Sequence, residues 1–82
     1  MTPFLACVSN NQYVSSDQVI AILDHSSNSV KKLIKSALEE KPRSVINLSG
    51  KKAAASVLVL TGDRYIILAL TPNVLSKRFE SG

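Results

Sequence analysis

The amino-acid sequence predicts a small α+β domain, in which a mostly antiparallel sheet packs against one central helix and a short C-terminal helix. Three observations support this fold class. Short apolar runs are separated by turn residues, one long segment has helical periodicity, and a Gly-Asp pair joins the last two apolar runs. The chain has 82 residues, which is enough for a single domain, placed here at residues 1–82.

The N-terminal part of the chain is predicted to form strands. PFLACV is a first strand, SNNQ is a turn, and YVSSDQVIAILD is one strand or two short strands with a kink at Ser15-Ser16. Cys7 lies in the first apolar run and is interpreted as a small core residue, with a reactive thiol as the alternative. A single cysteine also excludes an intrachain disulfide framework.

The segment HSSNSVKKLIKSALEEKPR is the clearest helix, expected near Ser29 to Glu40. Good capping residues precede it, and Pro42 ends it. Its apolar residues recur at helical spacing, namely Val30, Leu33, Ile34, Ala37 and Leu38. The lysines on the other side are interpreted as a solvated face, with a second basic binding face as the alternative; they are Lys31, Lys32 and Lys35.

The C-terminal half is predicted to contain three strands and a helix. SVINL is a short strand, SGKK turns the chain, and AAASVLVL and YIILAL form a hairpin. Gly62 can adopt the positive φ that a tight turn at TGDR requires. TPNVLSKRF is expected to form a short terminal helix, with Thr71 as its cap and Pro72 at its first position.

The apolar runs VIAIL, VLVL and YIILAL do not alternate with polar residues. Unbroken runs of this kind indicate that both faces of the sheet are shielded from water. The central helix can cover one face, and the terminal helix covers a little more. We therefore expect further copies of the chain to cover the rest in a homo-oligomer. The alternative is that the terminal helix folds back and covers the remainder alone.

The sequence offers little support for catalysis or metal binding. It contains one histidine and one cysteine, which are not arranged in a ligand motif. DHSS at residues 24–27 is interpreted as a loop and a helix cap, because consecutive residues rarely point at one reacting centre. SGKK lacks the spacing of a phosphate-binding loop and leads into a strand. We expect no enzyme, no metal site, no cofactor and no small-molecule substrate.

The charge of the chain suggests an anionic partner. Ten Lys and Arg residues against six Asp and Glu residues give a net charge of +4. Lys51 and Lys52 follow Gly50 at the start of a hairpin, where side chains and backbone amides can meet phosphates. The alternative is a solvated turn that protects an edge strand with charge.

The sequence also predicts a cytoplasmic protein without a membrane partner. Every apolar run is far shorter than the roughly 20 residues that a bilayer requires. The N-terminal residues lack the positive region and the sustained apolar region of a signal peptide.

Three stretches, YVSSDQVIAILD, SGKKAAASVLVL and DRYIILALTPNVLSKRF, resemble the small bacterial extracellular-matrix regulatory proteins RemA and RemB. The resemblance runs from Phe4 to Phe79. It implies a non-enzymatic, nucleoid-associated transcription regulator that controls biofilm-matrix genes. It further implies a closed ring of subunits with basic residues on the outside, around which double-stranded DNA wraps.

The resemblance also implies site residues. The Gly-Arg-Arg of the RemA pattern falls on Gly50-Lys51-Lys52, which keeps the charge and loses the bidentate fork of arginine. Two further arginines of the pattern fall on Gln18 and Ala54. We therefore expect Lys51 and Lys52 to contact DNA phosphates, with Gln18 nearby as a weaker polar contact. The rival hypothesis, favoured by Gln18 and Ala54, is an oligomeric interaction protein that does not itself touch DNA.

Overall fold

The computed structural model of the chain describes residues 3–9 and 12–80. The elements are β1 (Leu5–Ser9), β2 (Gln12–Ser15), the 3-10 helix η1 (Ser16–Gln18), β3 (Val19–Asp24), α1 (Asn28–Glu40), the 3-10 helix η2 (Pro42–Ser44), β4 (Val45–Asn47), β5 (Ser56–Leu60), β6 (Arg64–Leu68) and α2 (Pro72–Glu80). The predicted α+β class and both predicted helices are confirmed. The kink expected at Ser15-Ser16 is η1, which separates two short strands.

The strands form two sheets. β1 pairs with β2, and the larger sheet has the order β3-β5-β6-β4. β4 runs parallel to β6, while the other pairings are antiparallel. The predicted hairpin joins β5 and β6, and its turn places Gly62 at φ 78° and Asp63 at φ 57°. β5 and β6 therefore occupy the centre of the larger sheet, with β3 and β4 at its edges.

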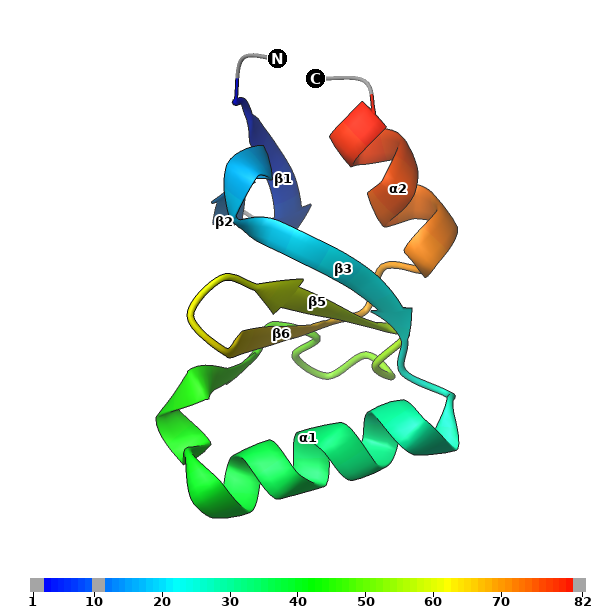
Figure 1. Ribbon diagram of the computed structural model, residues 1–82. Coiled ribbons are helices and arrows are strands. Elements are labelled where there is room, and N and C mark those ends of the chain that lie inside the picture. The colour runs from blue at the N-terminus through cyan, green and yellow to red at the C-terminus, as the bar shows by residue number, and fades with distance from the viewer. Residues whose placement is uncertain (1–2, 10–11, 81–82) are drawn as a thin grey trace.

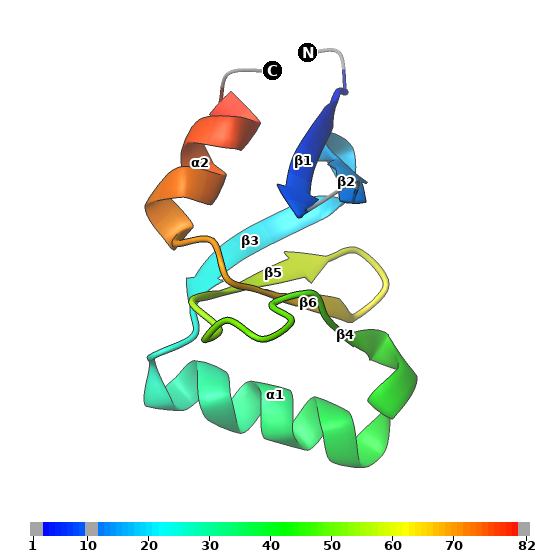
Figure 2. The ribbon, with the colours of Figure 1, turned by 180° about the vertical axis from the view of Figure 1, so that it is seen from behind.

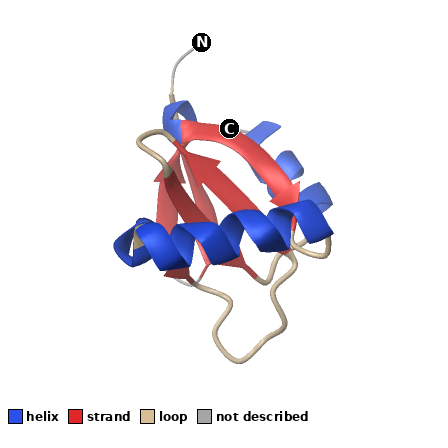
Figure 3. Ribbon diagram, turned by 60° about the horizontal axis from the view of Figure 1, so that its bottom comes forward, coloured by secondary structure: helices blue, strands red, loops and turns tan. Residues whose placement is uncertain are grey.

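Both faces of the central hairpin are covered within one chain. Figures 1 and 2 show α1 beneath the larger sheet and β1, β2 and α2 above it, and Figure 3 shows α1 lying across the sheet. Successive strand residues point to opposite faces, so that neighbours in sequence enter different clusters. On the α1 face the buried residues are Val30, Ile34, Val57 and Ile67. On the other face they are Val8, Val14, Leu58, Leu60, Ile66, Leu68 and Leu75.

The expectation that the chain cannot cover its own sheet is therefore wrong for β5 and β6. Leu58 and Leu68 are 0% exposed, although both point away from α1. The sequence analysis counted helices as the available cover, whereas the β1–β2 hairpin supplies much of it (Figure 2). A homo-oligomer stays a prediction, and it now depends on exposed apolar side chains elsewhere: Leu5, Tyr13, Ile20, Leu33, Leu38, Ile46 and Val74.

Two other residues lie differently from their predicted positions. Ile20 is 64% exposed, because the pairing of β3 with β5 shifts register between Val19 and Ala21 and leaves Ile20 in a bulge. Cys7 is half-buried rather than part of the core, since Ala6 and Val8 take the inward positions of β1. Its Sγ donates a hydrogen bond to the Ser9 carbonyl oxygen at 3.0 Å.

The helix boundaries follow the predicted signals. α1 ends at Glu40, two residues before Pro42, and only Val30 and Ile34 of its apolar stripe are buried. In α2, Pro72 is the first residue, and the Thr71 Oγ1 accepts a hydrogen bond from the Val74 N–H at 3.4 Å. Lys31, Lys32 and Lys35 are exposed on α1.

The turn between β3 and α1 holds a carboxylate in its ionised form. The Asp24 Oδ1 accepts hydrogen bonds from the Ser26 hydroxyl at 2.7 Å and from the Ser26 backbone N–H at 2.9 Å. These two bonds lower the pKa of Asp24, and the bond from the Ser26 hydroxyl has the larger effect. A carboxyl group of this kind stabilises the fold above its unfolded pKa, and that contribution is lost as the pH falls through its folded pKa.

Replacing the hydroxyl tests this assignment. Ser26→Ala should raise the pKa of Asp24 toward its ordinary value, while the remaining backbone hydrogen bond keeps the pKa below it. An NMR titration of the Asp24 carboxyl carbon measures the change. Ser27→Ala is the control, because the Ser27 side chain makes no capping hydrogen bond. Equal pKa values in the Ser26 variant and the native chain would contradict the assignment.

Candidate functional site

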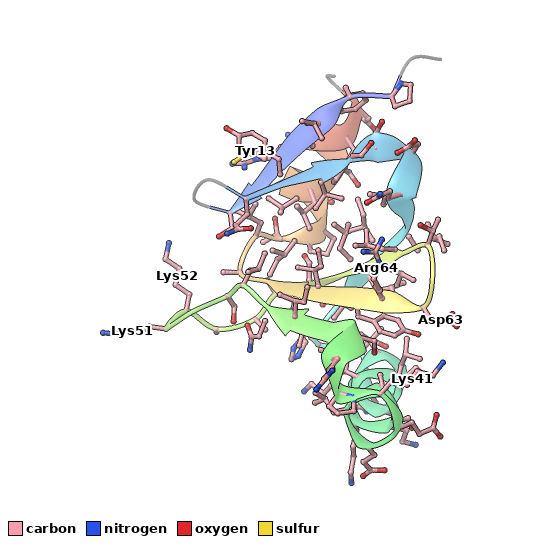
Figure 4. All side chains as sticks on the ribbon, turned by 90° about the vertical axis from the view of Figure 1, so that its left-hand side faces the viewer. Tyr13, Lys41, Lys51, Lys52, Asp63 and Arg64 are labelled. Atoms are coloured by element: carbon pink, nitrogen blue, oxygen red, sulfur yellow. The ribbon has the colours of Figure 1, made fainter. Side chains whose placement is uncertain are left out.

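The loop between β4 and β5 carries Lys51 and Lys52 at the surface. Figure 4 shows both side chains extending from this loop away from the rest of the molecule. Both residues are exposed, as is Gly50 before them. The prediction that the two lysines are exposed in a turn is confirmed. Their role in binding stays a prediction.

Both ends of the β4–β5 loop are tied to β6. The Leu48 N–H donates to the Ile67 carbonyl oxygen at 2.8 Å, and the Ala55 N–H donates to the Leu68 carbonyl oxygen at 2.8 Å. The two anchor points are consecutive residues of a strand that is buried in the core. The two ends of the loop are therefore held close together, and the lysines project from this end of the sheet.

A side-chain turn shapes the first part of the loop. The Asn47 Oδ1 accepts hydrogen bonds from the Ser49 N–H at 2.9 Å and from the Ser49 hydroxyl at 2.6 Å. The Ser49 carbonyl oxygen in turn accepts a bond from the Lys52 N–H at 3.2 Å. Gly50 has φ 64°, in the left-handed region that favours glycine. This positive φ explains why a glycine precedes the basic pair.

A surface hollow of about 530 Å³ lies beside this loop. Three segments contribute to it, namely the end of β1, the β4–β5 loop, and the chain from the end of β6 into α2. Its lining includes the cations Lys51, Lys52 and Arg78. Among the described residues, the lining contains no Asp or Glu. The hollow is therefore a positively charged surface that no lining carboxylate neutralises.

Arg78 was not singled out by the sequence analysis. Its Nη1 donates a hydrogen bond to the Cys7 carbonyl oxygen at 2.8 Å, across 71 positions of the chain. The neighbouring Phe79 ring lies 6.4 Å from the Phe4 ring, centroid to centroid, which also joins α2 to the N-terminal strands. The sequence shows only a basic residue late in a terminal helix. No local signal connects it to Lys51 and Lys52.

Gln18 lies away from the lysines in the folded chain, rather than nearby. Its carbonyl oxygen accepts a hydrogen bond from the Thr61 N–H at 2.9 Å, at the turn between β5 and β6. Its side chain lines a second hollow, of about 420 Å³, together with Arg64. Figure 4 shows Arg64 at the opposite end of the sheet from Lys51 and Lys52. The structure thus places Arg78 on the same hollow as the lysines and Gln18 on a different one.

Within residues 3–9 and 12–80, no three His, Cys, Asp or Glu side chains come together as a possible metal site. In the same part of the chain, no helix has both the length and the apolar character needed to cross a membrane. Ala54, the position of a family arginine, is half-buried and packs against the α1 side of the core.

The chain is a small α+β domain with a basic surface hollow beside the β4–β5 loop. Residues 5–79 match the family model of RemA-like proteins, described as extracellular matrix regulatory protein A-like. The chain therefore belongs to this family of matrix regulatory proteins, as its sequence resemblance predicted. A search of curated proteins found no match.

The conformation of Gly50 gives a prediction for the loop. Gly50→Ala should lower the free energy of unfolding by about 1 kcal/mol, because a side chain is unfavourable in the left-handed region. No heavy atom lies within 4 Å of the position of an added Cβ, so crowding adds nothing. Gly50→Asn is the matched control, since Asn adopts this conformation more readily, and it should lose less. Urea unfolding measures both, and equal stability of Gly50→Ala and the native chain would refute the conformational argument.

Proposed function

We propose that the protein is a non-enzymatic DNA-binding regulator of matrix genes, and that it acts as a homo-oligomeric ring in the cytoplasm. Membership of the RemA-like family supports the regulatory role. The observation that carries the DNA-binding part is the pair Lys51 and Lys52, exposed on an anchored loop beside a hollow whose described lining has no carboxylate. The net charge of +4 favours the same partner.

The basic loop suits the sugar–phosphate backbone. Lysine is a point charge with three N–H donors, so that it attracts phosphates without demanding one geometry. Such contacts position a protein on DNA and carry no sequence information by themselves. Binding through Lys51 and Lys52 is therefore expected to depend strongly on salt and weakly on DNA sequence.

Assembly would multiply these contacts. One subunit with two lysines binds DNA weakly, whereas a closed ring repeats the pair around its rim and gains avidity. Exposed apolar side chains such as Leu5, Tyr13 and Ile20 offer area for contacts between subunits. The proposed ring therefore explains how a small basic surface can hold a long duplex.

A second candidate function is an oligomeric interaction protein that does not contact DNA. The absence of arginine at Gln18 and Ala54 favours it, because two charges of the family pattern are missing. The exposed apolar side chains suit either function. Salt dependence separates them, since apolar protein contacts respond little to ionic strength.

The lysine pair can be tested against a matched pair. Lys51→Ala with Lys52→Ala should abolish the shift of duplex DNA in a gel, because both proposed phosphate contacts are lost. Lys31→Ala with Lys32→Ala is the control, since it removes two adjacent lysines that are exposed on α1. Binding by the Lys51 and Lys52 variant at the native level would reject this site. Loss of binding in the control alone would move the interface to α1.

Salt titration of the native protein gives an independent test of DNA binding. The logarithm of the binding constant should fall linearly with the logarithm of the salt concentration, by about 0.9 for each phosphate neutralised. Fluorescence anisotropy of a labelled duplex measures the slope. A slope near zero would favour the interaction protein over the DNA-binding regulator.

The assembly can be tested by mass in solution. Sedimentation velocity should show a single multiple of the subunit mass at micromolar concentration, with a further increase when duplex DNA is added. A stable monomer would contradict the ring.

A further inference from the structure

We propose that Arg78 is a third phosphate-binding residue, and that Arg78, Lys51 and Lys52 together form a phosphate-binding surface around the hollow beside the β4–β5 loop. The inference deepens the proposed function and rests on it for the identity of the partner. The chemistry recognised is a phosphate ester or anhydride. Its source is either the backbone of duplex DNA or a soluble polyphosphate, and the experiment below distinguishes these sources.

The three basic residues border the hollow from different parts of the fold. Lys51 and Lys52 come from a loop that is anchored to β6, and Arg78 comes from the last turn of α2. All three line the same hollow of about 530 Å³. Because no described lining residue is acidic, the three positive charges repel one another in the free protein. A bound anion would relieve this repulsion.

Arg78 is held in place before any ligand arrives. Its Nη1 donates to the Cys7 carbonyl oxygen at 2.8 Å, which fixes the end of the side chain against β1. A guanidinium has five N–H donors, and this bond uses one of them. The others allow the bidentate contact with phosphate oxygens that lysine cannot make. Arg78 thereby supplies at this site the planar donor group that Lys51 and Lys52 lack.

The position of Arg78 also has a purely structural explanation, which must be separated from binding. Cations in the last turn of a helix interact favourably with the helix dipole, and Arg78 lies in the last turn of α2. The hydrogen bond to Cys7 also helps to dock α2 on β1. A structural role alone predicts that removing the charge changes stability and leaves phosphate binding unaffected.

Arg78→Gln is the test variant, because glutamine removes the charge and keeps a polar side chain with N–H donors. Arg43→Gln is the matched control, since Arg43 is exposed in η2, at the other end of β4 from the lysine loop. Anisotropy with a labelled duplex should show that Arg78→Gln weakens binding about tenfold, the loss of one charge-assisted contact, and lowers the salt slope. Arg43→Gln should stay within about twofold of the native protein.

Pyrophosphate is the soluble probe. Added to the native protein, it should shift the backbone amide NMR signals of Lys51, Lys52 and Arg78 and leave those of α1 unchanged. If pyrophosphate also competes with duplex DNA, both sources use the hollow. If it shifts these signals without competing, the site takes a soluble phosphate. Both results support the phosphate site, and the first assigns it to the DNA interface.

The failures of the two proposals are distinguishable. If Arg78→Gln binds duplex and pyrophosphate as the native protein does, while the Lys51 and Lys52 variant does not, Arg78 is structural and the inference is overturned. If the native protein binds no duplex, the proposed function fails and the pyrophosphate shifts alone decide the site. If Arg78→Gln does not fold, the pyrophosphate-induced shifts of the native protein decide whether Arg78 belongs to the site. The absence of shifts at Arg78 would overturn the inference.

Discussion

The structure depends on the burial of one hairpin, β5–β6, on both of its faces by the same short chain. Val57, Leu58 and Leu68 are completely shielded from solvent. Burying an aliphatic side chain of this size contributes about 1.5–3 kcal/mol. A chain of this length has few fully buried aliphatic residues. The layers on both sides of the hairpin are therefore needed to keep these residues shielded from water. α1 supplies one layer, and the β1–β2 hairpin with α2 supplies the other (Figure 1).

The same hairpin also positions the charged surface. The end of β6 accepts hydrogen bonds from both ends of the loop that carries Lys51 and Lys52. Leu75 of α2 is buried against the face of the hairpin that points away from α1. This packing holds α2 next to β1, where Arg78 donates its hydrogen bond to Cys7. The loop and the helix are far apart in sequence, and they border the same hollow because each is attached to the same buried hairpin. Core packing and the basic hollow are thus two consequences of one arrangement.

Local signals in the sequence were enough to predict much of this fold. The apolar spacing of α1, the turn at Gly62 and the cap formed by Thr71 and Pro72 are all encoded within a few residues. The turn at SGKK, which carries Lys51 and Lys52, was predicted for the same reason, since a Ser-Gly pair between apolar segments indicates a turn.

Features that depend on contacts between distant segments were not predictable in this way. The β1–β2 hairpin shields one face of the larger sheet because of how the layers pack in three dimensions. No short sequence pattern predicts that packing. Arg78 meets Cys7 across 71 positions, so its place beside the lysines required the folded chain. Gln18 was grouped with the lysines by family pattern, whereas η1 places it at the β5–β6 turn.

Amide hydrogen exchange of the whole chain, alone and with duplex DNA, tests this account most directly. Alone, the amides of β5 and β6 should exchange most slowly, because only global unfolding exposes a hairpin that is buried on both faces. With DNA, new protection should appear in the β4–β5 loop and the last turn of α2, and not in α1. Rapid exchange throughout β5 and β6, or DNA-induced protection confined to α1, would contradict the account.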